Sequence, residues 1–255
     1  MLLTIDIGNT NIVFAWFDKD EQKLDSRIDT CQKRMADQYA VMLADIMKFR
    51  GISDISQVEA CIISSVVPTV TRQVIAAVES LWGVTPLTVG PGVKTGLNIK
   101  IDDPSSLGAD LVCGAVAAKT LYKTPCIAID LGTVSKIMAL DKNGALIGGV
   151  LSPGVGEGFK AMASSTALLP LVGTAKTARI IGTNTTDCIR SGVLYGTAFM
   201  LDGFIEGFEA ELGEKCTVVA TGGFSEIVVP YCKRKIEINK SLVSQGLRII
   251  FEKNK

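Results

Sequence analysis

Short apolar runs separated by polar turns open the chain. Residues 2–6 are apolar and rich in strand formers, residues 8–11 read Gly-Asn-Thr-Asn, and residues 12–17 are apolar again. Strand formers on both sides of a tight polar turn predict a pair of strands, with a second turn at residues 18–20. The chain is therefore expected to begin with a strand, a turn and a second strand.

Apolar residues recur at helical spacing in the segments that follow. Residues 35–49 place them on one face of a predicted helix that ends near Gly51, and residues 69–81 are a second predicted helix. Between them, residues 58–63 have the composition of a buried strand. The segment 106–119, rich in small and apolar residues, predicts a third helix.

The same order of patterns starts again in the middle of the chain. Residues 125–130 predict an apolar strand that ends in Asp, residues 132–133 a turn, and residues 135–141 a second strand. A hairpin signal at residues 141–144 precedes a further apolar run at residues 145–151. Helices over residues 187–212, a strand at 217–220 and a final helix over 242–252 complete the prediction.

This similarity between the two halves is an internal repeat. The sequence Ile-Asp-Ile-Gly-Asn-Thr at residues 5–10 is echoed by Ile-Asp-Leu-Gly-Thr at residues 129–133, half a chain later. A repeat of this length predicts two copies of one α/β lobe. We place the lobes at residues 1–120 and 121–255.

Composition narrows the class of protein. Hydrophobic residues make up 47% of the 255 residues and charged ones 20%, so long disordered stretches are not expected. Lys plus Arg and Asp plus Glu each number 26, and this balance does not favour nucleic acid as a partner. No apolar run reaches the ~20 residues of a membrane-spanning helix, and the N-terminus lacks the pattern of a secretory signal, so no membrane partner is expected.

The cysteine and histidine content narrows the chemistry. Seven cysteines, mostly inside apolar segments, indicate reduced core thiols of a cytoplasmic protein. The chain has no C-x-x-C pair and no His, so a zinc site is not expected. Any mechanism has to proceed without imidazole as the base.

In both copies of the repeat, a strand ending in Asp leads into a turn that contains glycine. Glycine allows a sharp bend and a close approach of a ligand, and successive amides in such turns form concavities that bind anions. Gly8 supplies this freedom in the first turn, and the side chains of Asn9, Thr10, Asn11 and Thr133 add neutral donors. The two turns are predicted to hold the phosphates of a nucleotide.

Asp6 ends the first of these strands, and a carboxylate beside phosphates would repel them unless a cation lay between. Mg²⁺ is typically held by one or two carboxylates together with substrate phosphates. Thr221-Gly222-Gly223, after a third buried strand, predicts another close approach, suited to the nucleoside. A single D-x-G-x-T is more often only a strand end with a turn. Two copies in a half-chain repeat, followed by T-G-G, favour nucleotide binding.

Taken in this order, the residues resemble one family, the type III pantothenate kinases, which phosphorylate pantothenate from ATP as the first step of coenzyme A biosynthesis. The similarity extends almost from end to end. It comprises two phosphate loops, an SSVVP segment, the start of a G-A-D-R motif and several later pieces: Asp6 to Phe14, Ser64-Ser65-Val66-Val67-Pro68, Gly108-Ala109-Asp110, Asp130-Leu131-Gly132-Thr133, Gly148-Gly149, Pro153-Gly154, Thr166-Ala167, Leu169-Pro170, Gly182-x-Asn184-Thr185, Ser191-Gly192 and Thr221-Gly222-Gly223.

The resemblance implies a fold of the actin-like superfamily that includes sugar and acetate kinases. It implies two duplicated actin-like (ribonuclease H-like) lobes with the nucleotide in an interlobe cleft. ATP would be held by the loop from Asp6 to Asn11 together with Thr133, Gly222 and Gly223, with Mg²⁺ at Asp6. Asp130 would bind a monovalent cation, K⁺ or NH₄⁺.

For the second substrate, the resemblance implies that Asp110 is the general base that accepts the hydroxyl proton. Gly108, Ala109, Asp110 and Thr185 would contact pantothenate or a similar small hydroxyl compound. The family is homodimeric, with the substrate site near the subunit interface. Read without the resemblance, Asp110 could equally be a carboxylate that complements the dipole of a helix N-terminus.

Three positions depart from the family pattern. Leu111 stands where the family has the Arg after its catalytic Asp, and Ile101 aligns with the family's upstream Tyr. Arg offers a planar fork for carboxylate or phosphate that Leu lacks. The second loop, usually G-T-A-T-T, reads Gly-Thr-Val-Ser-Lys and ends in Lys136.

Two interpretations of these departures compete. In the first, the protein is a working kinase that holds pantothenate differently or phosphorylates another small hydroxyl compound, and Lys136 replaces the monovalent cation. In the second, it is a non-catalytic paralogue that binds a nucleotide or a pantothenate-like ligand as a sensor or regulator. Lys136 could also be an ordinary surface lysine. A sugar kinase or heat-shock-type ATPase would fit the two loops but not the G-A-D segment.

Overall fold

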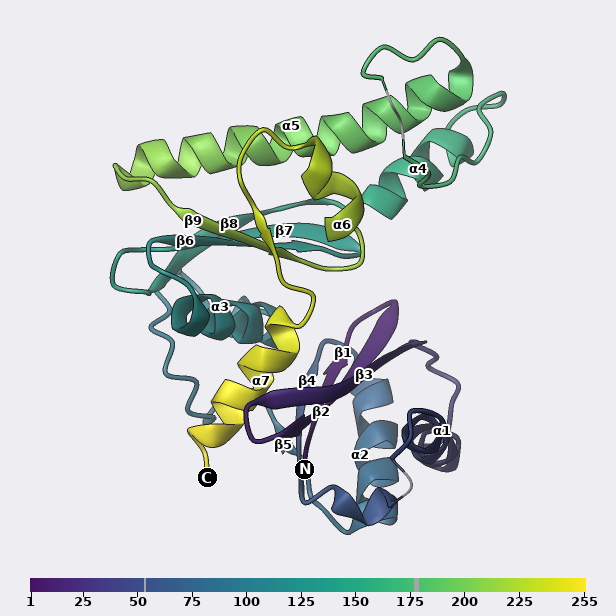
Figure 1. Ribbon diagram of the computed structural model, residues 1–255, viewed down its shortest axis with the longest axis vertical. Coiled ribbons are helices and arrows are strands. Elements are labelled where there is room, and N and C mark those ends of the chain that lie inside the picture. The colour runs from purple at the N-terminus through teal and green to yellow at the C-terminus, as the bar shows by residue number, and fades with distance from the viewer. Residues whose placement is uncertain (53, 177–178) are drawn as a thin grey trace. The chain divides into compact units, whose positions relative to one another are not determined.

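The computed structural model describes residues 1–52, 54–176 and 179–255, and its contacts group the chain into two compact units (Figure 1). The first unit comprises Met1–Gly96, Asp103–Ala117 and Leu242–Lys255. The second comprises Leu97–Asp102 and Ala118–Ser241. The lobe limits inferred from the repeat stay a prediction, and the final segment groups here with the first unit.

The first unit contains a five-stranded sheet. Its strands are β1 (Leu2–Ile7), β2 (Asn11–Asp18), β3 (Glu21–Asp29), β4 (Ala60–Ser65) and β5 (Leu87–Thr88), in the order β3-β2-β1-β4-β5. The first three strands form an antiparallel meander, and β4 and β5 run parallel to β1. Both faces of β1 are covered, which is why it is a nearly continuous apolar run and not an alternating one.

The second unit contains a sheet of the same topology. Its strands are β6 (Cys126–Leu131), β7 (Val134–Leu140), β8 (Leu146–Pro153), β9 (Thr217–Thr221) and β10 (Glu237–Ile238), in the order β10-β9-β6-β7-β8. Again three strands form an antiparallel meander and two further strands run parallel to its first strand. The duplication expected from the repeat is therefore confirmed.

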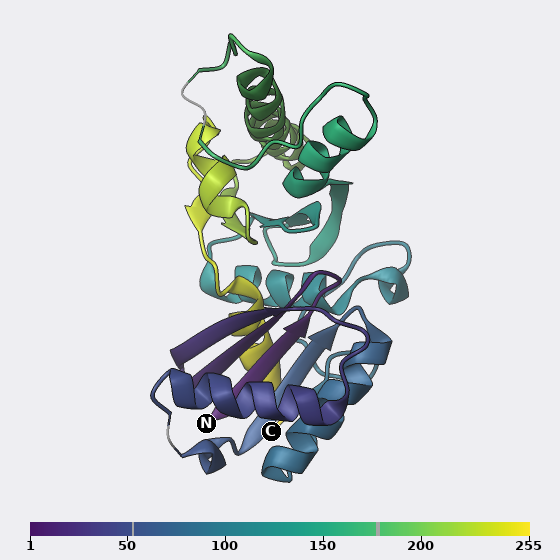
Figure 2. The same cartoon turned by 90° about the vertical axis from the view of Figure 1, so that its right-hand side faces the viewer.

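The sheet of the first unit has helices on both faces, as Figure 2 shows. α1 (Ala36–Phe49) and α2 (Pro68–Trp82) pack together on one face, and α7 (Leu242–Glu252) lies on the other, against β1 and β4. Proline opens α2 at its first position, where no intrahelical amide is needed, and Gly83 ends it in the left-handed region. α3 (Ala109–Leu121) begins in this unit.

In the second unit, α4 (Val155–Ser164) and the long α5 (Thr185–Leu212) pack together (Figure 1). The side chain of Asn184 caps α5 by accepting a hydrogen bond from the amide of Asp187 at 2.9 Å, and Gly213 ends the helix in the left-handed region. The buried face of α5 presents Leu194, Ala198, Leu201 and Ile205 to strand residues such as Ile129 and Ile137. α6 (Ser225–Val228) follows β9. Short 3₁₀ helices span Ile55–Gln57, Pro104–Ser106 and Val229–Tyr231.

Several elements were not predicted from the sequence, of which β3 and α4 are the longest. β3 was missed because it is an edge strand whose side chains are mostly exposed, with only Leu24 buried, so it carries little apolar signal. α4 was missed because Gly156 and Gly158 lower its helix propensity. The predicted helices over residues 187–212 form one continuous helix, α5.

Two further features of the structure concern the cysteine thiols and the length of the apolar helices. All seven cysteines are free thiols. Burial raises the pKa of the Cys126 and Cys232 thiols to about 12, so both stay protonated at neutral pH. Among the described residues, no helix has the length and apolar character needed to cross a bilayer.

Candidate functional site

The first predicted phosphate turn joins β1 to β2 and is stabilised by hydrogen bonds within the turn and from the residue that follows β3. Across the turn, the amide of Gly8 donates to the carbonyl of Asn11 at 3.0 Å. Thr30, just after β3, donates its amide to the carbonyl of Thr10 at 2.9 Å and its hydroxyl to the carbonyl of Gly8 at 2.6 Å. The side chains of Asn9, Thr10 and Asn11 are exposed. Sequence reasoning missed Thr30 because nothing local links it to a turn so far upstream.

Asp6 occupies the last position but one of β1. It is half-buried, and its register neighbours are Val13 on β2 and the fully buried Ser64 on β4. The carboxyl ends of β1 and β4 meet here because the two strands are parallel. A carboxylate beside a hydroxyl at such a strand end suits a hard cation that prefers oxygen ligands.

Asp110 is the second residue of α3, and its position depends on the glycine before the helix. The amide of Leu111 donates to Oδ1 of Asp110 at 2.9 Å. A Cβ atom at Gly108 would lie 2.6 Å from the same oxygen, so glycine is required for the carboxylate to fold back over the helix start. Ala109 opens the helix next to it.

The structure brings Asp110 and Asp6 into one neighbourhood of the first unit. Burial raises the pKa of the Cys113 thiol well above its ordinary value, and the negative charges of Asp6 and Asp110 raise it further. Both carboxylates therefore lie within electrostatic reach of the same buried thiol, one turn along α3 from Asp110. A Cβ atom at Gly108 would also lie 3.6 Å from Val66, whose amide donates to the carbonyl of Ile7 at 3.1 Å, so the segment with the predicted base adjoins the strand end with the predicted Mg²⁺ ligand.

The second predicted phosphate turn, Gly132 and Thr133, joins β6 to β7 and is one residue shorter than the first. Gly154, which follows β8, presses against it. A Cβ atom at Gly154 would lie 2.2 Å from the carbonyl oxygen of Thr133 and 2.7 Å from that of Gly132. Real side chains do not approach that closely, so the backbone of the turn is supported directly by the backbone at Gly154.

The Thr-Gly-Gly loop lies against the same strand end. Gly222 has a φ of +91°, and a Cβ atom there would lie 2.6 Å from Oδ1 of Asp130 and 2.6 Å from the amide nitrogen of Leu131. The amide of Phe224 donates to the carbonyl of Leu131 at 3.1 Å, and Gly223 is exposed. The second unit therefore brings together Asp130, the Gly132–Thr133 turn and Gly222, as the motif order suggested.

Asp130 is paired with Lys136 across the hairpin. The two residues are register partners on β6 and β7, and Nζ of Lys136 lies 3.1 Å from Oδ2 of Asp130. The side chain of Asp130 is 26% exposed and that of Lys136 is 19% exposed, so the ion pair is half-buried. Lys136 is therefore not an ordinary surface lysine, and its ammonium lies where a monovalent cation was expected.

Thr185 is the first residue of α5 and is exposed. Its neighbourhood is built by the preceding loop. A Cβ atom at Gly182 would lie 2.4 Å from the amide nitrogen of Cys188, and the hydroxyl of Ser191 donates to the carbonyl of Ile180. The loop is thus folded tightly onto the helix start.

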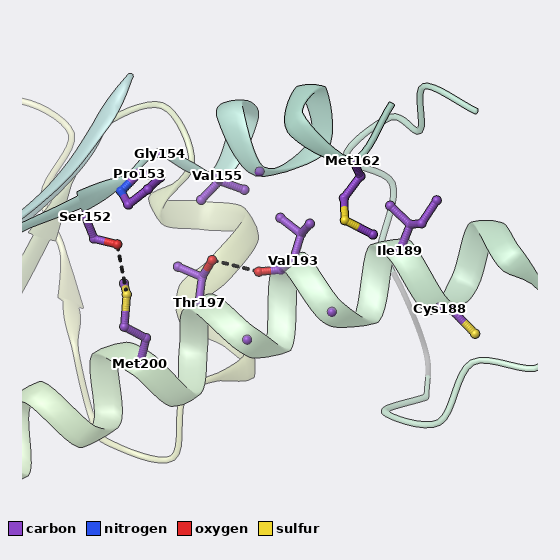
Figure 3. Close-up of a pocket in the computed structure, with 13 residues that line it drawn as sticks. Ser152, Pro153, Gly154, Val155, Met162, Cys188, Ile189, Val193, Thr197 and Met200 are labelled. Carbon is purple, nitrogen blue, oxygen red and sulfur yellow. Dashed lines mark hydrogen bonds between the residues drawn. The ribbon is translucent and has the colours of Figure 1, made fainter. Parts of the chain in front are cut away.

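A groove of about 450 Å³ lies between α4 and α5 (Figure 3). Figure 3 shows Val155, Met162, Ile189 and Val193 along it, and most of its lining is apolar. Its two hydroxyls are already engaged: Ser152 donates to Sδ of Met200 at 3.3 Å, and Thr197 donates to the carbonyl of Val193 at 2.7 Å. The groove suits an apolar surface better than a charged ligand.

Within the described part of the chain, no group of three or more His, Cys, Asp or Glu side chains is arranged to hold a metal ion. A metal at Asp6 would therefore take its remaining ligands from water and substrate oxygens, which is the usual habit of Mg²⁺.

Comparison with known proteins identifies the family. The sequence profile of the family described as Type III pantothenate kinase matches residues 2–207. A type III pantothenate kinase from Moorella thermoacetica is 36% identical over 254 residues, covering 100% of both chains. The chain belongs to the type III pantothenate kinase family. Membership of this family supports a kinase, and type III pantothenate kinases use ATP.

Comparison with solved structures shows which fold the chain has. A Baf-family protein from Campylobacter jejuni superposes with a TM-score of 0.63 at 17% identity, covering 99% of this chain and 98% of that one. An activator of 2-hydroxyisocaproyl-CoA dehydratase from Clostridium difficile, solved with bound ADPNP, superposes with a TM-score of 0.57 at 12% identity, covering 99% and 95%. At these identities the likeness shows the fold, which is the predicted α/β fold with two actin-like lobes.

The sequence-predicted site residues fall into two groups, one in each unit. Asp6, the first turn, Gly108, Ala109 and Asp110 belong to the first unit, and Asp130, Thr133, Thr185, Gly222 and Gly223 belong to the second. Leu111 and Ile101, the two residues predicted to depart from the family pattern near the substrate, are both half-buried. The interlobe cleft that would join the two groups stays a prediction.

Proposed function

We propose that this protein transfers the γ-phosphoryl group of ATP to the hydroxyl of pantothenate, giving 4'-phosphopantothenate and ADP, the first step of coenzyme A biosynthesis. Membership of the family supports the reaction class. The single observation that carries the proposal within this chain is that the start of α3, with Asp110, lies beside the end of β1, with Asp6, because a phosphoryl-transfer enzyme needs its base near its metal-binding carboxylate.

The proposed reaction assigns one step to Asp110. Its carboxylate accepts the proton of the attacking hydroxyl, the hydroxyl oxygen forms a bond to the γ-phosphorus, and the bond from that phosphorus to the bridging oxygen of ADP breaks. The transition state is loose, so the protein mainly has to position groups and neutralise charge. A carboxylate can therefore act as base without a strongly raised pKa, which suits a chain with no His.

The proposed nucleotide site uses both turns. Residues 8–11 and Thr133 would donate to phosphate oxygens, and Gly222 and Gly223 would let the nucleoside approach the main chain. Asp6 would hold Mg²⁺, which supplies charge neutralisation at the phosphates. The tight support of these turns by Thr30 and Gly154 favours this role, because preformed donors do not have to be ordered on binding.

The proposed substrate contacts are Gly108, Ala109, Asp110 and Thr185. Leu111 and Ile101 remove an Arg and a Tyr that the family pattern has near the substrate. Because each charge-assisted hydrogen bond contributes ~1.5–3 kcal/mol, their loss predicts weak pantothenate binding or a different small hydroxyl substrate.

The same two departures favour a second candidate function, a non-catalytic paralogue that binds a nucleotide or a pantothenate-like ligand and acts as a regulator. One comparison separates the two candidates. The wild-type protein is incubated with ATP, Mg²⁺ and pantothenate, and 4'-phosphopantothenate is quantified by mass spectrometry beside Leu111→Arg. Product from the wild type supports the kinase. An inert wild type with an active Leu111→Arg variant supports the paralogue.

Asp110→Asn tests the base. We expect kcat to fall by about 10²–10⁴-fold while the ATP dissociation constant stays within about twofold, because the amide keeps the shape but accepts no proton. Asp102→Asn, at an exposed position earlier in the sequence, is the matched control and should leave kcat unchanged. A normal rate in Asp110→Asn would remove Asp110 from the mechanism.

We also propose a cytoplasmic homodimer. The free cysteines and the use of ATP support the location. Exposed apolar side chains on β8, α4 and α5 and on the segment between the two helices support a second copy as the occupant of the α4–α5 groove: Leu151, Met162, Leu168, Leu171, Ile181 and Phe199. Light scattering should give a dimer mass for the wild type and a monomer for Leu168→Asp with Ile181→Asp. A monomeric wild type would refute the dimer.

A further inference from the structure

In the ion pair between Asp130 and Lys136, the ammonium group of the lysine occupies the position beside the carboxylate that a bound cation would take. Nζ of Lys136 lies 3.1 Å from Oδ2 of Asp130, and the two residues face each other across the β6–β7 hairpin. The other carboxylate oxygen, Oδ1, lies against the backbone at Gly222 and Gly132. The surroundings of the carboxylate are thus occupied by an ammonium on one side and by close main chain on the other.

This arrangement does not fit a free monovalent cation at Asp130. A bound K⁺ would need a place on the carboxylate that the Lys136 ammonium already takes, and two adjacent positive charges would repel each other. An ammonium group and a monovalent cation carry the same charge, and NH₄⁺ is chemically the nearest analogue of the lysine head group. The groups around the Asp130 carboxylate therefore favour the Lys136 ammonium, and not an exchangeable ion, as its positively charged partner.

The first copy of the repeat shows what is special about the second. Asp6 and Asp130 are equivalent residues, and their partners on the parallel strand, Ser64 and Thr221, both carry hydroxyls. Their partners across the hairpin differ: Val13 lies opposite Asp6, whereas Lys136 lies opposite Asp130. The same scaffold thus has an apolar neighbour at one carboxylate and a tethered cation at the other.

We propose that Lys136 is a positioning residue that supplies, at Asp130, the positive charge of the family's monovalent cation, so that nucleotide binding by this chain needs neither K⁺ nor NH₄⁺. The proposal rests on the proposed nucleotide site. In the sheet, Lys136 lies in register between Asp130 on β6 and Leu151 on β8, and its hydrogen bond to Asp130 places the ammonium beside that carboxylate.

The test compares cation dependence in the wild type and in Lys136→Ala. ATP affinity is measured by calorimetry and the unfolding midpoint of the nucleotide-free protein by thermal denaturation, each in KCl and in choline chloride of equal concentration. We expect the wild type to give the same values in both salts. In Lys136→Ala, the vacated space should admit K⁺, which should then tighten ATP binding by about tenfold, a coupling of ordinary size between two sites.

Further variants separate charge from packing. Lys136→Arg keeps the charge and should remain independent of K⁺, and Lys136→Met fills the space without charge and should bind ATP weakly in both salts. Lys142→Ala, an exposed lysine on the following turn, is the control for losing one positive charge from this hairpin and should behave as the wild type. If Lys136→Ala does not fold, the Met and Arg variants carry the same comparison.

The results divide cleanly. Stronger ATP binding or a higher unfolding midpoint of the wild type in KCl would overturn the proposal, as would a Lys136→Ala variant that binds ATP normally without K⁺ or is not rescued by it. A wild type that binds ATP equally in both salts but phosphorylates nothing would refute the proposed kinase and leave Lys136 as the resident cation. A K⁺-dependent midpoint of nucleotide-free Lys136→Ala alone would support the proposal even without turnover.

Discussion

The two copies of the strand–turn–strand motif share a scaffold and differ in how their turns are supported. In the first unit, the turn after β1 is held by hydrogen bonds from Thr30 to two carbonyls. In the second, the shorter turn after β6 is held by direct backbone contact with Gly154, and Gly222 presses on the strand end. The first turn is thus held by a side-chain hydroxyl together with backbone amides, and the second depends on positions where no side chain fits.

The carboxylates at the ends of the two strands differ in the residue that lies across the hairpin from each. Val13, an apolar residue, lies opposite Asp6 across the first hairpin. Asp130 faces Lys136, which settles its electrostatics within the fold. The two copies thus share the sheet and the acidic strand end and differ at the position across the hairpin from the carboxylate. The following changes test this contrast, from the largest expected effect to the smallest.

Asp6→Asn should have the largest effect. If Asp6 holds Mg²⁺, the amide should lower kcat by about 10²–10³-fold, because a preorganised charge at the phosphates is lost. Steady-state rates across an Mg²⁺ titration measure this, with Asp18→Asn at the exposed end of β2 as the control. An Asp6→Asn enzyme with an unchanged Mg²⁺ requirement would contradict the assignment.

Val13→Lys should give the first copy the character of the second. A lysine opposite Asp6 would compete with Mg²⁺ for the carboxylate, so the Mg²⁺ concentration for half-maximal rate should rise about 5- to 10-fold, the effect of roughly 1 kcal/mol between nearby charges in a hydrated site. Val13→Met controls for size and should change it little. An equal response to both variants would show that bulk and not charge matters.

Gly154→Ala should destabilise the protein by about 1–3 kcal/mol, because a Cβ atom would meet the carbonyl of Thr133 at 2.2 Å and force the second turn to move. Gly8→Ala in the first turn should cost less than about 1 kcal/mol, since its Cβ atom would lie 3.2 Å from the carbonyl oxygen of Asn11. Urea unfolding of both variants ranks them. The reverse order would refute the idea that the second turn is the more tightly supported one.

Glu209→Gln tests an ionic anchor of the second unit, where α5 is tied to the chain around β9 by more than apolar contacts. The Glu209 carboxylate is buried and accepts hydrogen bonds from Lys215 at 2.6 Å and from the amide of Cys216 at 3.0 Å, and it pairs with Arg234. We expect the variant to lose about 1–2 kcal/mol at pH 7.

The same residue predicts a pH dependence. Burial raises the pKa of Glu209, but the hydrogen bonds from Lys215 and Cys216 and the charge of Arg234 outweigh it and lower the pKa below the ordinary 4.5. The stabilisation is therefore present above that value and is lost as pH falls through the lower pKa of the folded protein. Urea midpoints of wild type and Glu209→Gln should converge in that acidic range. A constant difference at all pH values would contradict the assignment.

Much of the fold could be predicted because its elements carry a strong local signal. β1 and β6 are apolar runs ended by Asp, α1 has a clear helical period, and the repeat linked the two sheets before any contact was known. β3 could not be found this way because an edge strand buries few side chains, and α4 was hidden by its glycines.

The candidate site was less accessible to sequence reasoning because its supports are distant in the chain. Thr30 and Gly154 touch the turns only after the meanders fold, and no local pattern marks them. The pairing of Lys136 with Asp130 could be anticipated, since the two lie on either side of a short hairpin. The neighbourhood of Asp6 and Asp110 depends on how the start of α3 lies beside Val66, next to the end of β1, which only the structure supplies.

The return of α7 to the first unit has a consequence for biosynthesis. A Cβ atom at Gly246 would lie 1.9 Å from the carbonyl oxygen of Cys113, so α7 and α3 touch backbone to backbone beside β1. The ribosome makes β1 to β5 long before it makes α7, so a nascent chain carries one uncovered apolar sheet face through most of translation. Premature termination before Leu242 should therefore yield fragments that chaperones retain or proteases remove, and C-terminal truncation should be far more damaging than trimming any exposed loop.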